Sequence, residues 1–399
     1  MLCSIISHMT RPRYLESCIK NDLAGKMVFV AGPRQVGKTT LARRILEGEV
    51  AGSYFKWDNR EDRREIRQAR WPGGPATVVL DELHKWRSWK GWVKGEYDKH
   101  GDRLRFLITG SAQMDIYRRG GDSLQGRYHH YRLHPFSYRE DIVEFVSPPA
   151  RVGEEPVFEP SGNQDAVEAL MEYGGFSEPF LAQSARTLRR WQRERLERFF
   201  REDVRDLESV RHLSSLELLV DLIHDRVSSP LSLNSLRKDL EASHRALTHW
   251  MEILERLYYL YRVPPFASTK VRSLRKMPKV YLWDWSMVRA RGPRFENLIA
   301  SHLLKLCHYL QDREGYRAEV RYLRDRHGRE VDFLVLLDRK PWFAVEAKVS
   351  ETAIDPNLAY FRDRLKIPWT YQVVLDGARD FIQDGVRCLP ARQFLTALI

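Results

Sequence analysis

The sequence predicts an α/β protein whose N-terminal part contains a parallel sheet, and three observations support this fold class. Short apolar segments at residues 27–31, 77–80 and 105–109 alternate with helical patterns, which is typical of strands joined by crossover helices. A glycine-containing turn separates the first segment from a helical pattern at 38–46. The two later segments each have polar residues at their C-terminal ends. We therefore expect a sheet of parallel strands in this part of the chain.

The 399-residue length favours more than one domain, because a single hydrophobic core rarely extends over so long a chain. A stretch with proline and glycine at 147–162 indicates a first boundary, and a basic, proline-containing connector at 264–278 indicates a second. The sequence thus predicts three parts, which are an α/β domain at 1–150, a helical domain at 151–265 and a smaller α/β domain at 266–399.

The helical middle part contains two apolar-periodic segments at 231–240 and 244–260, separated by a short break at 241–243. This spacing is typical of a helix-turn-helix, and we expect it to belong to a winged helix. Four polar residues fit one exposed face of the second helix: His244, Arg245, Thr248 and His249. Such a face reads DNA in some proteins and serves as a lid or a protein contact in others, so both alternatives stay open.

Composition and charge favour a protein with a polyanionic partner and argue against a membrane protein and a cysteine-based metal site. Lysine and arginine outnumber aspartate and glutamate by 66 to 54, and the resulting charge of +12 favours a polyanionic partner such as DNA. No apolar run approaches the roughly 20 residues that cross a bilayer, and the first residues do not resemble a signal peptide, so we expect a cytoplasmic protein without a membrane partner. The cysteines form no CxxC pair, which argues against a zinc site or a disulfide framework: Cys3, Cys18, Cys307 and Cys388.

A phosphate-binding loop is the strongest motif in the chain. The segment GPRQVGKT, at residues 32–39, fits the GxxxxGK[ST] pattern and lies between a predicted strand and a predicted helix, as that pattern requires. We expect backbone N–H groups of the loop to bind ATP phosphates, Lys38 to contact the β- and γ-phosphates, and Thr39 to bind Mg²⁺. The expected nucleotide-binding residues are Gly32, Pro33, Arg34, Gln35, Val36, Gly37, Lys38, Thr39 and Thr40.

An acidic pair follows the second predicted strand, about forty residues after this loop. Asp81 comes directly after the apolar residues 78–80, where it would hold the Mg²⁺ ion together with Thr39. Glu82 would polarise the attacking water, a role that hydrolysis requires and nucleotide binding alone does not. The pair therefore predicts an ATPase rather than a simple nucleotide-binding protein.

The third predicted strand, in the segment FLITGSA, resembles the strand that AAA+ ATPases place between the two elements just described. Its polar end would sense the γ-phosphate through Thr109 or Ser111, and we expect Ser111 to contact the nucleotide. Further along, Arg127 is a candidate arginine finger, with a surface ion pair as the alternative. A finger that acts on a neighbouring subunit would require the protein to form a homo-oligomer.

The C-terminal part contains a second group of charged residues. Asp332 lies in the apolar segment 331–337, and Glu346 and Lys348 follow the strand predicted at 342–345. This is the arrangement of PD-(D/E)xK nucleases, in which two acidic residues on adjacent strands hold Mg²⁺, with Mn²⁺ as a substitute, and the lysine helps to activate water. Glu296 matches the further acidic residue that many such nucleases carry. The alternative is that the fold serves as a docking module and that its acidic residues form ion pairs.

Together these segments resemble one family over nearly the whole chain: GPRQVGKTTLA, VVLDELHKW, FLITGSA, SLQGRYHHYRLHPFSYRE, GGFSEP, RFENLIASHLL and GREVDFLV. It is the bacterial and archaeal group of AAA-type ATP-binding proteins with a C-terminal domain of unknown function. The resemblance implies an AAA+ P-loop ATPase domain, a helical middle and a restriction-endonuclease-like C-terminal fold. We expect either an ATP-driven enzyme that couples hydrolysis to DNA cleavage, or a regulatory ATPase switch whose C-terminal domain docks a partner.

Overall fold

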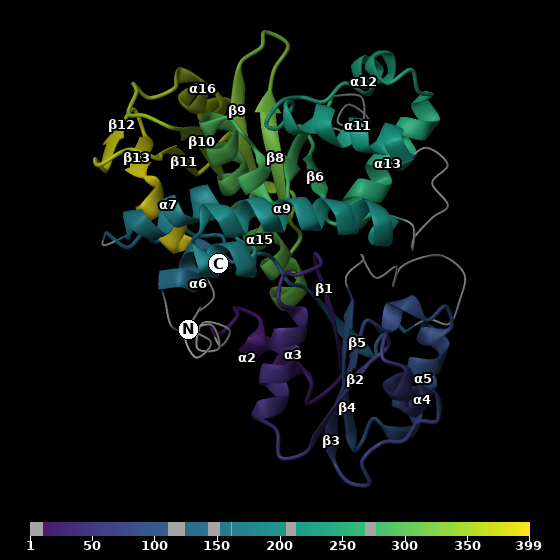
Figure 1. Cartoon of the computed structure of the whole chain (residues 1–399). Coiled ribbons are helices and arrows are strands. Elements are labelled where there is room, and N and C mark those ends of the chain that lie inside the picture. Colours follow the sequence, from purple (N-terminus) through teal and green to yellow (C-terminus); the bar gives the residue numbers. More distant parts are fainter. Residues whose placement is uncertain (1–10, 111–123, 143–151, 161, 205–212, 268–276) are drawn as a thin grey trace. The chain divides into compact units, whose positions relative to one another are not determined.

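The computed structural model describes residues 11–110, 124–142, 152–160, 162–204, 213–267 and 277–399 (Figure 1). The chain forms two compact units, one spanning residues 1–134 and the other 135–399. The first unit therefore ends before the domain boundary predicted at 150, and the further division of the second unit at 265 stays a prediction. Within the described ranges, no helix is both long enough and apolar enough to cross a membrane.

The first unit contains a five-stranded sheet in the order β2-β3-β4-β1-β5, with every neighbouring pair parallel. The strands are β1 (Met27–Ala31), β2 (Gly52–Lys56), β3 (Ala76–Asp81), β4 (Leu104–Gly110) and β5 (Tyr128–Arg132). The prediction of a parallel α/β sheet is confirmed, and β4 lies between β1 and β3 as the resemblance implies. Strands β1, β3 and β4 are almost wholly buried, which explains why they read as continuous apolar runs.

Helices cover both faces of this sheet, with α2 (Glu16–Asp22) and α3 (Lys38–Glu47) on one face and α4 (Arg60–Arg67) and α5 (Trp89–His100) on the other (Figure 1). The face under α4 and α5 has an aromatic core in which Phe29, Phe106 and Trp89 are buried. Helix α4 begins where the side chain of Asn59 accepts hydrogen bonds from two backbone N–H groups of its first turn. A short 3-10 turn at Leu83–Lys85 follows β3.

The second unit begins with helices: α6 (Tyr138–Ile142), α7 (Gln164–Tyr173), α8 (Ser177–Ala182), α9 (Ala185–Arg198), a π-helical turn (Phe199–Asp203), α11 (Leu213–His224), α12 (Leu233–Asp239) and α13 (His244–Arg256). The two helices predicted on either side of the break at 241–243 are therefore present as α12 and α13. The side chain of Ser243 caps α13 by accepting a hydrogen bond from the backbone N–H of Ala246. The second helix ends at Arg256, earlier than predicted, because β6 (Leu260–Val263) follows and pairs antiparallel with β7 (Lys279–Leu282).

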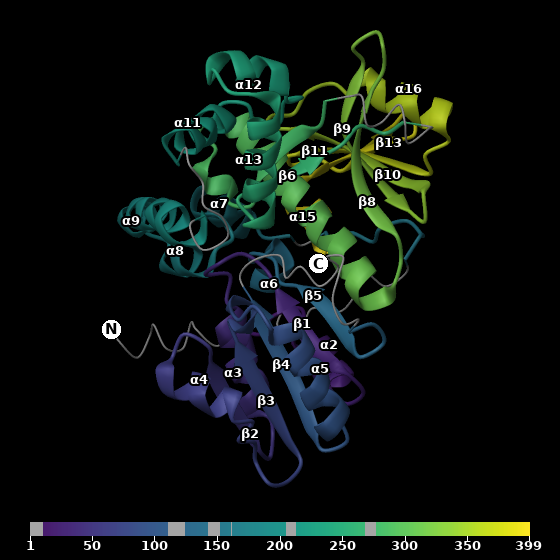
Figure 2. The ribbon, with the colours of Figure 1, turned by 90° about the vertical axis from the view of Figure 1, so that its right-hand side faces the viewer.

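The second unit also contains a six-stranded sheet in the order β12-β13-β11-β10-β9-β8 (Figure 1). Figure 2 shows β8, β9, β10, β11 and β13 of this sheet from another side. After a 3-10 turn (Trp285–Met287), the elements are α15 (Arg291–Glu314), β8 (Ala318–Arg324), β9 (Glu330–Leu337), β10 (Lys340–Lys348), α16 (Pro356–Leu365), β11 (Trp369–Val374), β12 (Phe381–Gln383), β13 (Val386–Pro390), α17 (Ala391–Phe394) and a last 3-10 turn (Leu395–Ala397). Strands β8, β9 and β10 form an antiparallel meander, and β11 joins β10 in parallel after the crossover helix α16.

This connectivity decides which side chains share a face of the sheet. Ala344 of β10 pairs with Leu334 of β9, and both pack in a core with Leu358 and Phe361 of α16. Because side chains alternate between the two faces of a strand, residues 332, 344, 346 and 348 belong to this same face. The fold therefore brings the predicted acidic residues of β9 and β10 to one side of the sheet.

Candidate functional site

The phosphate loop connects β1 to α3 at the carboxyl edge of the first sheet. Gly37, which precedes the helix, has a φ of 100°, a value that glycine adopts without strain. A side chain at Gly32 would collide with the carbonyl oxygen of Leu133, so only glycine fits there. Lys38 is buried, and its Nζ atom donates to the carbonyl oxygens of Gly32 at 3.0 Å and Pro33 at 2.7 Å. The loop thus wraps around a lysine ammonium at a helix N-terminus, which is a geometry that binds phosphate.

Asp81 is the centre of the site, and three hydroxyl groups donate to its carboxylate. Thr39 Oγ1 lies 2.9 Å from Asp81 Oδ2, the hydroxyl of Tyr54 donates to the same oxygen, and Thr109 Oγ1 donates to Oδ1. Burial raises the pKa of Asp81, but the three hydroxyl donors and the positive charge of Lys38 outweigh it and hold the pKa below its ordinary value. The carboxylate is therefore ionised next to the phosphate loop.

Two of these hydroxyl groups bear on the sequence-based expectations. Thr109, one of the two residues considered as a γ-phosphate sensor, contacts Asp81 directly, whereas Ser111 lies outside the described residues. Tyr54 was missed because β2 carries no motif and reaches Asp81 only through strand pairing, in which Lys56 of β2 is opposite Asp81. Burial and the bond to Asp81 raise the pKa of the Tyr54 phenol, so it stays a donor.

Glu82 follows Asp81 in a left-handed backbone conformation with a φ of 59°. Such a conformation is unusual for a residue other than glycine and is concentrated at functional sites. The backbone N–H of Glu82 donates to the carbonyl oxygen of Thr109 at 3.1 Å, and this bond holds the turn in place. The Glu82 carboxylate lies 3.7 Å from His84 Nε2 and 3.9 Å from Lys85 Nζ. Burial lowers the pKa of His84. Glu82 is thus held at the end of β3, beside the Asp81 carboxylate.

Arg13 is a second residue that the sequence analysis missed. It is buried just before α2, and its guanidinium donates to the carbonyl oxygen of Val36 in the phosphate loop at 2.8 Å. The same group donates to the carbonyl oxygen of His134, which follows β5. Arg13 therefore ties the loop to the end of the neighbouring strand, and no local sequence pattern marks it for this role.

Arg127 lies at the N-terminal end of the parallel strands, and the phosphate loop lies at their C-terminal end. Its carbonyl oxygen accepts a hydrogen bond from the backbone N–H of Met27, at the start of β1. Its guanidinium forms an ion pair with Asp98 at 2.7 Å. Within the first unit, Arg127 therefore does not reach the phosphate loop at the other end of β1, and its role as a finger in a second copy of the chain stays a prediction.

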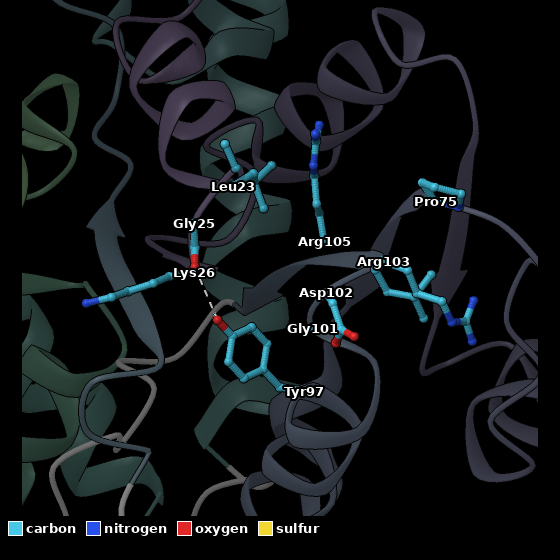
Figure 3. A pocket seen from close by; sticks show the side chains of 11 residues that line it. Leu23, Gly25, Lys26, Pro75, Tyr97, Gly101, Asp102, Arg103 and Arg105 are labelled. Carbon is cyan, nitrogen blue, oxygen red and sulfur yellow. Dashed lines mark hydrogen bonds between the residues drawn. The ribbon is translucent and has the colours of Figure 1, made fainter.

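A small cavity of about 130 Å³ lies at this same N-terminal end of the strands, as Figure 3 shows. Lys26, Arg103 and Arg105 contribute to its wall, and the hydroxyl of Tyr97 donates to the carbonyl oxygen of Gly25 at 3.2 Å across it. Leu104, the first residue of β4, also lines it. The cavity is therefore distinct from the phosphate loop, and it contains none of the residues predicted for the nucleotide site.

The structure brings together Asp332 of β9 with Glu346 and Lys348 of β10. The Ala347 N–H donates to Asp332 Oδ2 at 3.1 Å, and the Asp332 N–H donates to Glu346 Oε2 at 3.2 Å. The Lys348 ammonium donates to Glu346 Oε1 at 2.7 Å and to Asp355, before α16, at 3.2 Å. The arrangement expected from the spacing of these residues is therefore present in the fold.

Lys279, at the start of β7, is the residue of this cluster that the sequence analysis did not identify. Its Nζ atom lies 2.8–3.0 Å from a carboxylate oxygen of each of three acidic residues, Glu296, Glu330 and Asp332. The Lys279 side chain is 2% exposed. Burial lowers its pKa, but the three neighbouring carboxylates raise it more, so that the ammonium stays charged.

Carboxylates outnumber the lysines in this cluster, by five to two. Lys279 contacts three carboxylates and Lys348 contacts two. Burial, followed by repulsion from Asp332, raises the pKa of both Glu296 and Glu346 above the ordinary value.

The fold resemblance implies a divalent cation at this cluster, and the donor set is of the right kind, since Mg²⁺ prefers carboxylate oxygens. The place between Glu296 and Asp332, however, contains the ammonium of Lys279, and a divalent cation would have to share it. In the described part of the chain, no group of three or more His, Cys, Asp or Glu side chains could hold a metal ion. The residues as arranged do not fit a metal, so the expectation of Glu296, Asp332 and Glu346 as metal ligands has no geometric support.

Comparisons with known families divide the chain into three segments. Residues 24–142 match an AAA domain, residues 164–296 match a domain of unknown function, DUF8612, and residues 291–394 match another, DUF4143. An uncharacterized protein of Mycobacterium tuberculosis is 22% identical over 384 residues, which cover 93% of this chain and 81% of the relative. An uncharacterized protein of Methanocaldococcus jannaschii is 20% identical over 365 residues, covering 86% of this chain and 80% of the relative.

Among solved structures, a Walker-type ATPase of Pyrococcus abyssi superimposes with a TM-score of 0.42 and 14% identity, covering 71% of this chain and 98% of the other. The RuvB Holliday junction branch migration motor of Thermotoga maritima superimposes with a TM-score of 0.32 and 17% identity, covering 64% of this chain and 94% of the other. The AAA match coincides with the parallel sheet, the phosphate loop and the Asp81 cluster. Residues 24–142 therefore form a P-loop ATPase domain of the AAA type.

Proposed function

We propose that the chain binds and hydrolyses ATP at the loop between β1 and α3. The observation that carries this proposal is the Asp81 carboxylate, which Thr39 of the loop contacts at 2.9 Å and Thr109 of the neighbouring strand also contacts. Three separate segments of the chain thus converge on one ionised group beside Lys38. An AAA match over the same residues supports the same activity.

The donor set at this site fits Mg²⁺. Thr39 and Asp81 present two oxygen ligands side by side, and they are the residues that would hold the ion. When bound, Mg²⁺ would supply positive charge that offsets the charge of the phosphates. Lys38 would exchange its carbonyl partners for phosphate oxygens, and Glu82 would orient the attacking water and accept its proton.

We also propose that the chain forms a homo-oligomer in which Arg127 acts as an arginine finger at the nucleotide site of the neighbouring copy. Arg127 lies at the start of β1, away from the loop of its own chain, so a finger role would require a second copy in which Arg127 leaves its ion pair with Asp98. An arginine finger contributes about 10³–10⁵ in turnover. Hydrolysis per subunit should then rise with protein concentration, and this rise should disappear in Arg127→Ala.

For the second unit, two functions compete. Metal-dependent DNA cleavage is favoured by the meeting of Asp332, Glu346 and Lys348 on adjacent strands. A non-catalytic docking module is favoured by the ion pairs in which these acidic residues and Glu296 are engaged. Since an ammonium lies among the carboxylates that a metal would need, we favour the docking module. The whole chain is then an ATP-dependent regulatory switch.

DNA is the partner class that the charge of the chain favours. His244, Arg245 and His249 are exposed on α13, while Leu247 and Met251 of the same helix are buried, so its polar face is available to a polyanion. If DNA binds, its affinity should fall steeply between low and physiological salt, because lysine and arginine contacts release counter-ions from phosphates. A flat salt response, or no binding at low salt, would instead favour a protein partner.

The deciding experiment compares wild type with Lys38→Ala in nucleotide binding and in steady-state hydrolysis. We expect the substitution to weaken ATP binding on the order of tenfold or more, because the phosphates lose a buried counter-charge. Lys305→Ala is a matched control, since Lys305 is a buried lysine of the second unit that contacts Glu140 instead of the phosphate loop. Unchanged ATP affinity in Lys38→Ala would refute the site.

Labelled DNA incubated with Mg²⁺ or Mn²⁺, with and without ATP, tests cleavage in the same preparation.

A further inference from the structure

Lys279 occupies a position that acidic clusters of this arrangement usually give to a cation. Its ammonium lies 2.9 Å from Asp332 Oδ1 and 3.0 Å from Glu296 Oε1, so it bridges the strand-borne and helix-borne acidic residues. It also lies 5.6 Å from the centre of the Tyr322 ring, which favours a cation there. The contacts of Lys279 are therefore those of a positive ion bound at the centre of the cluster.

The backbone around Lys279 is fixed on several sides. Asn297 of α15 donates to the carbonyl oxygen of Leu282 at 2.9 Å and accepts from its N–H at 2.8 Å, and these bonds fasten β7 to α15. The hydroxyl of Tyr281 donates to Glu296 at 2.6 Å. Lys279 itself pairs with Val263 of β6. If the Lys279 side chain moved out of the cluster, Glu296 and Asp332 would lose their shared partner.

We propose that the ammonium of Lys279 permanently replaces a divalent cation in the second unit, and that this lysine closes a latent metal site. The three carboxylate oxygens lie 2.8–3.0 Å from Nζ, and they would need to approach to about 2.0–2.1 Å to bind Mg²⁺. They already converge on one point, so removal of the lysine leaves a site of matching charge. The inference rests on the proposed function of the second unit as a docking module without metal chemistry.

The test is a Mn²⁺ titration of the full-length, nucleotide-free protein, followed by the paramagnetic resonance signal of the free ion. We expect wild type and Asp332→Asn to bind Mn²⁺ equally, because the ion does not enter the cluster while Lys279 is present. We expect Lys279→Met to gain one Mn²⁺ site whose affinity is at least about tenfold higher than that of wild type for Mn²⁺. The melting temperature of this variant should rise when Mn²⁺ is added. The added site should disappear in Lys279→Met/Asp332→Asn.

Lys305→Met is the matched control, because Lys305 is equally buried and forms an ion pair with Glu140 outside the acidic cluster, so its removal should create no Mn²⁺ site. Should Lys279→Met fail to fold, Lys279→Met/Glu330→Gln retains Glu296 and Asp332 with less repulsion and should gain the same site. Wild-type binding that Asp332→Asn abolishes would overturn the inference, as would the absence of Mn²⁺ binding in both lysine variants.

The two proposals fail in distinguishable ways. Mn²⁺ binding at Asp332 in wild type, without cleavage of DNA, overturns the inference and leaves the docking function intact. Cleavage that persists in Asp332→Asn overturns the docking function and leaves the inference about Lys279 intact. Neither result depends on ATP hydrolysis, which is measured in the other unit.

Discussion

The two units each contain a buried lysine near carboxylates, and the two lysines have different partners. Lys38 donates to two backbone carbonyl oxygens of its own loop, and hydroxyl groups rather than a lysine donate to the nearby Asp81. Lys279 contacts three carboxylates directly. Carbonyl oxygens are neutral and can be exchanged for phosphate oxygens, whereas a carboxylate paired with an ammonium loses a full charge interaction when the pair opens.

Because of this difference, the Lys38 site can accept a ligand, whereas at the Lys279 site a lysine of the chain itself takes the place of a ligand. In the first unit, Lys38 and Asp81 can gain partners of opposite charge from a nucleotide and its Mg²⁺ ion. In the second unit, the fold supplies the cation itself. A family resemblance in the acidic residues therefore does not transfer the metal chemistry, because one additional lysine changes what the same carboxylates can bind.

The largest effect that we expect is on stability, in Lys279→Met. Breaking a buried ion pair by removing one partner costs about 3–5 kcal/mol, because the carboxylates lose their counter-charge. Lys348→Met is the control, since the Lys348 side chain is 30% exposed and water can partly replace it, so the loss should be smaller. Urea unfolding monitored by tryptophan fluorescence measures both. Equal losses for the two variants would contradict the central position of Lys279.

The second effect concerns catalysis in the first unit. Glu82→Gln should bind ATP with near-normal affinity and lose roughly two or more orders of magnitude in turnover, because the amide cannot accept the proton of the attacking water. Nucleotide affinity and steady-state hydrolysis are measured on the same preparation. Glu61→Gln, an exposed change on α4, is the control and should leave both unchanged. Hydrolysis by Glu82→Gln at the wild-type rate would remove this residue from the mechanism.

The third effect is a pH dependence confined to the second unit. The pKa of Glu346 is raised in the folded protein, by burial first and then by repulsion from Asp332. A group with a raised folded pKa stabilises most below its unfolded value, which is 4.5 for glutamate, and this contribution is lost as pH rises through the folded pKa. The free energy of unfolding should therefore fall as pH rises from about 5 to 8.5. The free energy of unfolding, measured across this pH range, should change less with pH in Glu346→Gln than in wild type. An equal pH dependence in both proteins would contradict the assignment to Glu346.

The smallest effect is expected for Tyr54→Phe, which removes one of three hydroxyl donors to Asp81. A single hydrogen bond contributes about 0.5–1.5 kcal/mol, and water or a bound ion can replace it at a ligand site. We therefore expect a loss of stability of about 1 kcal/mol or less without nucleotide, and a smaller loss with ATP and Mg²⁺. Melting temperatures with and without ligand test this. A larger loss in the presence of nucleotide would show that Tyr54 contacts the ligand shell itself.

The sequence by itself determined the nucleotide site to a large extent. A strand, a glycine turn and a helix in immediate succession position Gly37 and Lys38 by local geometry alone, and Asp81 follows from the end of a buried strand. The position of β4 between β1 and β3 followed from the resemblance to AAA+ ATPases. In the second unit, the spacing that resembles PD-(D/E)xK nucleases predicted that Asp332 and Glu346 would meet on adjacent strands, and side-chain alternation placed Lys348 on the same face as Glu346.

The tertiary structure alone decided what those residues contact. Tyr54 reaches Asp81 from a strand without a motif, and Arg13 reaches the phosphate loop from a segment 23 residues away. Lys279 precedes Glu296 by 17 residues and Asp332 by 53, so no local pattern links it to them. Spacing along the chain encodes contacts within a strand or turn, whereas the partner of a buried charge depends on which distant segment the fold packs against it. This is why the acidic residues could be predicted from the sequence and their lysine counter-ion could not.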